Sequence, residues 1–145
     1  MSLPEFDSQG NLPVAVHRAS LDEVVTRFGH GSSQRQLVTT RLIRVYELAS
    51  STSKLKRFII FGSYVTAKPD PNDVDIILIM NDDFTQEECV VEARPLFDHL
   101  QAQREFGASV FAIRPSQILL ETVDSFITHW QLRRDKGRRG IVEVS

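Results

Sequence analysis

Short apolar runs are spaced along the chain in a way that predicts buried strands. Residues 58–61 and 110–113 are continuously apolar, and residues 74–80 are apolar except for Asp75. Runs of this length without polar alternation are typical of strands covered on both faces. Residues 141–144 add a candidate edge strand near the end of the sequence.

Two helix start signals precede the first of these strands. Ser20 followed by Glu23 has the form of a capping box, which predicts a helix beginning at Ser20. Ser33 is the candidate cap of a second, longer helix with apolar residues at helical spacing. We expect the arginines of this second helix, Arg35 among them, to lie mostly on its polar side.

The remaining segments predict two more helices and two irregular ends. A helix with a break at Pro95 is expected over residues 85–105, and another within 115–133, with Leu119 in its apolar stripe. Residues 1–19 form an N-terminal arm, and residues 133–145 form a basic tail. The order of elements predicts an α/β or α+β sheet with helices packed on one side, in a single domain of residues 1–145.

Composition and charge narrow the class of protein. The chain has 145 residues, of which 41% are hydrophobic and 25% charged, close to soluble globular proteins, so disorder is not expected. The net charge of -2 argues against broad non-specific binding to nucleic acid but leaves room for a local basic patch. We expect a cytoplasmic protein that does not enter a membrane, because the N-terminus lacks a secretory signal and no apolar run is long enough to cross a bilayer.

Two of the predicted strands meet at a cluster of candidate functional residues. Gly62 and Ser63 end the first strand, and Asp73 and Asp75 open the second. Residues two apart in a strand share a face, so the two carboxylates are expected on one side. Glycine lets the backbone approach a ligand closely, and amides after Ser63 at the start of a helical turn would suit a phosphate.

The two carboxylates require a partner. Asp75 lies inside an apolar run, where a buried and unpaired carboxylate is strongly unfavourable, and two like charges at one strand end repel each other. A divalent cation removes both problems, and oxygen ligands suit Mg²⁺. We therefore predict Asp73 and Asp75 as metal ligands and catalytic residues, with Gly62 and Ser63 on nucleotide phosphates. Lys68, in the following loop, is either a third phosphate ligand or a solvated lysine.

This segment resembles the signature of the DNA polymerase beta-like nucleotidyltransferase superfamily, in which Gly-Ser is followed by Asp-x-Asp between apolar strands. The wider sequence, including Gly62-Ser-Tyr-Val-Thr-Ala-Lys68 and Pro71-Asn-Asp-Val-Asp75, resembles a group of short bacterial proteins with this fold. The resemblance implies a mixed sheet with helices on one face. It also implies that Gly62 and Ser63 contact the phosphates and that Asp73 and Asp75 hold two Mg²⁺ ions.

The chain departs from that superfamily at one position. The superfamily uses a third carboxylate on a later strand, which helps to hold the metal and can take the proton of the attacking hydroxyl. Ser109 stands at the matching position, and serine is neither a general base at neutral pH nor a good metal ligand. Either Glu105 or the substrate completes the site, or the protein binds nucleotide and metal without efficient turnover.

Two hypotheses follow. The chain is a Mg²⁺-dependent nucleotidyltransferase that moves a nucleoside monophosphate from an NTP to an acceptor hydroxyl, or it is a catalytically weak nucleotide-binding or antitoxin-like partner protein with the same fold. A homodimer or a partner protein would supply the acceptor-binding surface. The basic cluster of the tail is a candidate contact for a triphosphate or RNA, although a solvated turn is favoured; its members are Arg133, Arg134, Lys136, Arg138 and Arg139.

Overall fold

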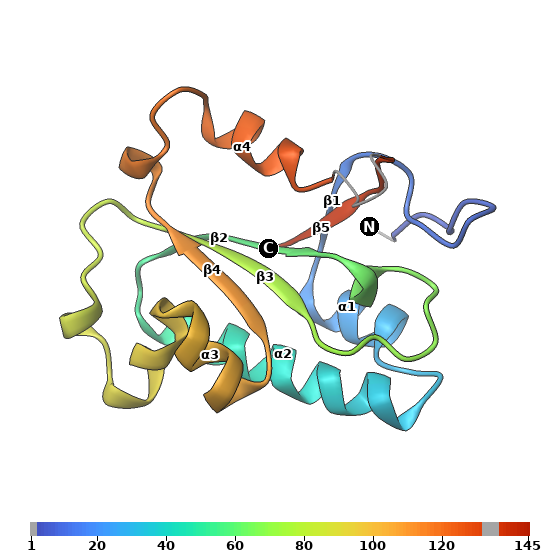
Figure 1. The fold of residues 1–145 in the computed structure, drawn as a ribbon, viewed down its shortest axis with the longest axis horizontal. Helices are drawn as coiled ribbons and strands as arrows, with labels where there is room; N and C mark the ends of the chain where they lie inside the picture. Colours follow the sequence, from blue (N-terminus) through green and yellow to red (C-terminus); the bar gives the residue numbers. More distant parts are fainter. Residues whose placement is uncertain (1–2, 132–136) are drawn as a thin grey trace.

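The computed structural model describes residues 3–131 and 137–145, which form a mixed sheet with helices around it (Figure 1). The strands are β1 (Val16–Ala19), β2 (Leu55–Phe61), β3 (Asp75–Met80), β4 (Ser109–Ile113) and β5 (Ile141–Val144). Their order in the sheet is β1-β5-β2-β3-β4. The β1–β5 and β3–β4 pairs are parallel, whereas β2 is antiparallel to both of its neighbours. The predicted α+β class with a mixed sheet is thereby confirmed.

The described helices fall close to the predicted ranges. The α-helices are α1 (Leu21–Phe28), α2 (Ser33–Ser51), α3 (His99–Phe106) and α4 (Val123–His129). Short 3-10 turns complete the connections: η1 (Ser63–Val65), η2 (Gln86–Glu88), η3 (Val91–Phe97) and η4 (Pro115–Gln117).

The caps explain where the first two helices begin. The Ser20 hydroxyl accepts from the Glu23 backbone at 3.1 Å, and the Glu23 carboxylate accepts from the Ser20 backbone at 3.3 Å, which confirms the capping box. The cap of α2 is Ser32 and not Ser33: its hydroxyl accepts from the Arg35 backbone at 3.1 Å. Ser32 has extended backbone angles, as an N-cap requires, whereas Ser33 is already helical.

The segment 85–105 is broken, as predicted, but the break before α3 lies at Asp98 and not at Pro95. Pro95 lies within η3, and α3 starts only after Asp98, whose carboxylate accepts from the Gln101 backbone at 3.0 Å. Gly107 ends α3 in the left-handed conformation, with a φ of 63°. The chain then enters β4 directly.

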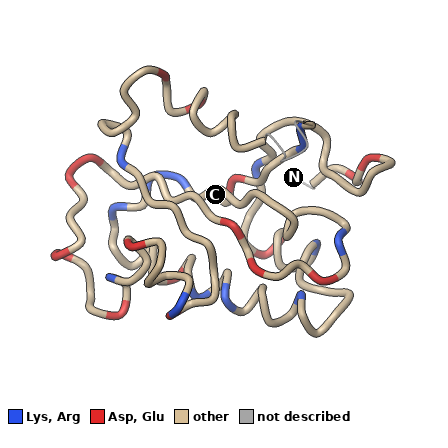
Figure 2. Tube along the Cα trace, in the orientation of Figure 1, with Lys and Arg blue, Asp and Glu red and all other residues tan. Residues whose placement is uncertain are grey.

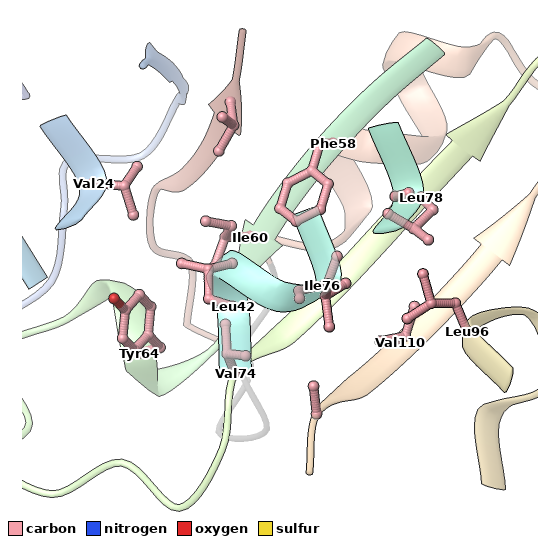
Figure 3. Close-up of a cluster of buried hydrophobic side chains, with 14 of the residues drawn as sticks. Val24, Leu42, Phe58, Ile60, Tyr64, Val74, Ile76, Leu78, Leu96 and Val110 are labelled. Carbon is pink, nitrogen blue, oxygen red and sulfur yellow. The ribbon is translucent and has the colours of Figure 1, made fainter. Parts of the chain in front are cut away.

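Alternating residues of β3 separate two apolar clusters. Ile76 and Leu78 face α1, α2 and α3 and pack with Val24 and Leu42 in the main core (Figure 3). Ile77 and Ile79 face the opposite side, where they pack with Ile127 of α4. The prediction that the helices pack on one face holds for α1, α2 and α3 but is wrong for α4, which covers part of the other face (Figure 1).

Three sequence predictions about the ends and the last helix need correction. Residues 16–19 were assigned to an arm but form β1, because β5 supplies a parallel partner. Strand β5 is not an edge strand, since it lies between β1 and β2. Leu119 lies outside α4 and is 84% exposed. Within the described residues, no helix combines the length and apolarity needed to span a bilayer.

Candidate functional site

Strands β2 and β3 bring Gly62 against Asp75. Phe61 pairs with Asp75 across the antiparallel ladder, so Gly62 follows directly at the end of β2. Gly62 has φ 80° and ψ -164°, a combination open essentially to glycine alone. A Cβ at this position would stand 3.0 Å from Asp75 Cγ and closer still to its Oδ2. The bare backbone of residue 62 is therefore what allows the Asp75 carboxylate to lie where it does.

Ser63 begins the η1 turn immediately after this contact. The Thr66 backbone N–H and the Thr66 hydroxyl both donate to the Ser63 carbonyl, at 3.1 and 2.7 Å. Tyr64 and Val65 are fully buried and anchor the turn in the main core. Ser63 itself is half-buried, and its hydroxyl has no hydrogen-bond partner among the residues that the structure describes. The two buried side chains therefore fix the turn, while the Ser63 hydroxyl remains available to a ligand.

Asp73 lies just before β3, in a connection tied to the start of α2. The Gln34 side-chain amide donates to the carbonyls of Pro71 and Asn72 at 2.9 and 3.2 Å. Asp73 and Asp75 are both half-buried, with the fully buried Val74 between them. Because β3 begins at Asp75, the strand period that was expected to align the two carboxylates covers only Asp75.

Ser109 stands directly beside Asp75 on the other side. The two residues are register partners in the parallel β3–β4 ladder, and the Ser109 backbone donates to the Val74 carbonyl at 3.0 Å. Asp75 is therefore flanked by Phe61 and Ser109. Among residues 3–131 and 137–145, no three His, Cys, Asp or Glu side chains gather where they could hold a metal ion.

These residues fit a loosely held Mg²⁺ ion better than a closed metal centre. Mg²⁺ in nucleotide sites commonly takes one or two carboxylates, keeps several waters, and receives its remaining oxygens from phosphates. Asp73 and Asp75 would supply the carboxylates, and the space that a Cβ at Gly62 would fill is left to the Asp75 carboxylate. The two Mg²⁺ ions that the superfamily resemblance implies would have to share these two carboxylates, because no group of three His, Cys, Asp or Glu side chains gathers among the described residues.

Glu105, considered as a replacement for the third carboxylate, points elsewhere. It is exposed on α3 and lines a groove with Arg41 and Arg44 of α2, on the helical side of the sheet. Asp98 is engaged as the N-cap of α3. The strand neighbour of Asp75 therefore remains Ser109.

Lys68 follows the turn with its backbone held and its side chain exposed. Its carbonyl accepts two bonds from the Arg35 guanidinium, at 3.1 Å from Nε and 2.7 Å from Nη2. Its N–H donates to the Thr66 hydroxyl at 3.2 Å. This arrangement fixes the path of the loop without deciding what the ammonium group contacts.

Arg35 is the residue that sequence reasoning missed. The helical pattern predicts Arg35 on the polar side of α2, yet it is 6% exposed. Its guanidinium donates to the carbonyls of Phe28, Tyr64, Thr66 and Lys68. Burial lowers the pKa of Arg35, while the nearby Tyr64 and Asp70 oppose that shift. The signal was available, because residue 35 precedes the buried Val38, Leu42 and Val45 by helical steps.

The basic tail is only partly described. Arg133, Arg134 and Lys136 lie outside the described residues. Arg138 is exposed, and the Arg139 backbone donates to the Gln131 carbonyl at 2.9 Å.

Comparison with known proteins gives one match. The model of the Family of unknown function (DUF6932) matches residues 4–145. No curated protein matches the chain, and no solved structure does so either. Because the match extends over almost the whole sequence, the chain belongs to the Family of unknown function (DUF6932).

Proposed function

We propose that this protein binds a nucleoside triphosphate together with Mg²⁺ at the joined ends of β2 and β3. The observation that carries the proposal is the close approach of the Gly62 backbone to the Asp75 carboxylate. Glycine adopts this conformation without steric penalty, and its missing Cβ leaves room for a half-buried carboxylate where the two strand ends meet. Such features concentrate where a protein holds a ligand.

Each candidate residue has a role in this proposal. Asp73 and Asp75 would hold Mg²⁺, which neutralises the triphosphate when bound. The backbone of Gly62 and the hydroxyl of Ser63 would contact the phosphates, and Lys68 would add a positive charge from the exposed loop. Mg²⁺ and nucleoside triphosphates are both abundant in the cytoplasm, and a cytoplasmic location belongs to the same proposal.

Binding without efficient transfer is the form of this function that the site supports best. The strand position beside Asp75 carries the Ser109 hydroxyl, which takes no proton from an acceptor at neutral pH. A nucleotide-binding partner protein, in the manner of an antitoxin, needs no such base. Nucleotidyl transfer to an acceptor hydroxyl is the second candidate, favoured by the pair Asp73 and Asp75 at one strand start. For transfer, a homodimer or a partner protein would supply the acceptor surface.

The test is thermal unfolding with ATP, GTP, CTP or UTP, each with and without Mg²⁺. A ligand that binds only the folded protein raises the unfolding midpoint by mass action. We expect a Mg²⁺-dependent rise for at least one nucleotide, and we expect Asp75→Asn to remove it. Asp22→Asn, at an exposed position of α1, removes the same charge away from the site and serves as the control.

Release of pyrophosphate and transfer of nucleotide label then separate the two candidates. A midpoint shift without turnover supports the binding protein, and turnover lost in Asp75→Asn supports the transferase. The whole proposal fails if no nucleotide shifts the midpoint, or if Asp75→Asn and Asp22→Asn respond alike.

A further inference from the structure

A groove lies between α2 and the η3–α3 segment, on the side of the sheet where the main core packs. It has a volume of about 880 Å³. Thr40, Arg41 and Arg44 line it from α2, and Arg104 and Phe106 line it from α3. Figure 2 shows basic positions of α2 and of the end of α3 close together in this part of the molecule. The groove therefore gathers positive charge on a chain whose net charge is negative.

The three guanidinium groups in the groove have no hydrogen-bond or ion-pair partner in the described part of the chain. Within residues 3–131 and 137–145, Arg41, Arg44 and Arg104 form neither an ion pair nor a side-chain hydrogen bond. Arg57, by contrast, binds Glu143 and Asp124. Three arginines left without acceptors in one concavity indicate that the acceptor comes from outside.

Packing holds Arg41 in the groove in the absence of an acceptor. The side chain lies against the bare backbone of Gly107, where a Cβ would stand 2.8 Å from Arg41 Nε and 3.0 Å from its Cδ. Gly107 also adopts a positive φ of 63°. Arg41 is half-buried as a result, whereas Arg44 and Arg104 are exposed. One guanidinium is thus preset and two are free to follow a ligand.

The same groove offers apolar surface. Phe106, which packs partly buried against the main core, contributes the one aromatic ring among the described residues that line the groove, and Val91 is 68% exposed. A positively charged groove combined with rings on which bases stack is the usual construction of single-strand nucleic-acid sites. Glu92 and Glu105, which also line the groove, would repel carboxylates and phosphates alike, so they favour a ligand that also carries hydrogen-bond donors. In a nucleic acid they would find amino and hydroxyl donors between the phosphates.

We propose that this groove binds single-stranded nucleic acid. Arg41, Arg44 and Arg104 contact phosphates of the backbone, and Phe106 and Val91 contact bases. A duplex is not the ligand, since it would need a broad basic face that a chain of net charge -2 does not provide. The proposal does not depend on the nucleotide site at Asp75, which lies at the end of a strand.

Fluorescence anisotropy with a labelled RNA or DNA strand of about twelve nucleotides tests this directly, because a single OB-fold-sized site covers roughly that length or less. With three phosphate contacts, the logarithm of the affinity should fall with the logarithm of salt at a slope of about -2. Arg41→Gln and Arg104→Gln should each weaken binding roughly five- to tenfold, and the double variant should bring the slope to about -0.7. Arg41→Lys, which keeps the charge, should lose less than Arg41→Gln.

Two controls keep the outcome specific. Lys56→Gln removes an exposed charge of β2 outside the groove and should leave the affinity unchanged. Asp75→Asn should also leave it unchanged, so that failure of the nucleotide site is distinguished from failure of the groove. Equal affinity for RNA and DNA, or a preference for RNA through its 2′-hydroxyls, supports the proposal. The proposal is overturned if neither strand binds at low salt, if Lys56→Gln weakens binding as much as Arg41→Gln, or if polyglutamate displaces the strand at equal charge concentration.

Discussion

The Arg35 guanidinium donates a hydrogen bond to the Thr66 carbonyl at 2.6 Å, and this bond joins helix α2 to the loop that follows the Gly62–Ser63 turn. Further bonds from the same group reach Tyr64 and Lys68. The backbone of the loop makes few hydrogen bonds to other backbone groups. The Arg35 side chain therefore supplies the hydrogen bonds that a neighbouring strand would otherwise supply. The candidate phosphate site is therefore positioned by a residue that does not belong to it.

Replacing Arg35 by lysine should lower the free energy of unfolding by about 3 kcal/mol, because a single ammonium group cannot reach all of the carbonyls to which the planar guanidinium donates. Urea unfolding followed by circular dichroism measures this loss. Arg44→Lys, on an exposed turn of the same helix, should change stability by less than about 0.5 kcal/mol. Equal losses in the two variants would contradict the role assigned to Arg35.

Gly62→Ala should lower the free energy of unfolding by about 3 kcal/mol and abolish Mg²⁺–nucleotide binding. Alanine at position 62 must adopt a disfavoured positive φ, and its methyl group must also displace the Asp75 carboxylate. Gly31→Ala is the matched control, since Gly31 has a φ of 100° but no atom within 4 Å of the added Cβ. It should cost only backbone strain, about 1 kcal/mol. In the double variant Gly62→Ala/Asp75→Ala, part of the loss should be recovered; strict additivity would show that the two residues do not interact.

Ser109→Asp should make stability depend on Mg²⁺. The new carboxylate would neighbour Asp75 across the parallel ladder, and like charges at adjacent strand positions repel. Without Mg²⁺ we expect the unfolding midpoint to fall by about 3 °C or more. Mg²⁺ should restore it, and pyrophosphate release should rise in the same variant if the site is a weakened transferase. Ser109→Ala, which adds no charge and keeps both carboxylates, should show a smaller Mg²⁺ effect than Ser109→Asp; equal Mg²⁺ effects in the two variants would show that residue 109 does not neighbour the ion.

Tyr64 should make the protein less stable in alkaline solution. Burial raises the pKa of the Tyr64 phenol, while its hydrogen bond with Thr39, at 2.6 Å, and the charge of Arg35 act in the opposite direction. A raised pKa in the folded state means that the stabilising contribution is complete below the unfolded value near pH 10 and is lost as the pH rises above it. Guanidinium unfolding between about pH 8 and 11 should show a decline that is shallower in Tyr64→Phe. Parallel curves would assign the decline to other groups.

Local signals allowed most elements to be predicted from the sequence. The Ser20–Glu23 capping box is complete within four residues, so its prediction needed no tertiary information. The apolar runs of β2 and β3 are buried on both faces, and for this reason their positions could be predicted from the sequence. The parallel pairing of β3 with β4 places Ser109 beside Asp75, as the superfamily resemblance implied.

Features that depend on residues far apart in the sequence could not be predicted. Strand β1 carries Val16 and His17 in no regular pattern, and it is a strand only because residues 141 and 142 lie beside it. Arg35 looks like a surface residue until the carbonyls of residues 64–68 are brought over it. For the candidate site, sequence indicated the residues, and the fold adds the contact of Gly62 with Asp75. The nucleotide and the metal remain predictions.

The place of β5 in the sheet has a consequence for how the chain folds during synthesis. Strand β2 emerges from the ribosome early and finds β3 soon afterwards, but its other edge has no partner until residues 141–144 have been made. Until then that edge presents the open backbone of an apolar strand, which favours pairing with other chains. A nascent chain that stalls after β3 but before residue 141 would therefore expose an incomplete sheet. We expect such an intermediate to bind a chaperone that covers strand edges.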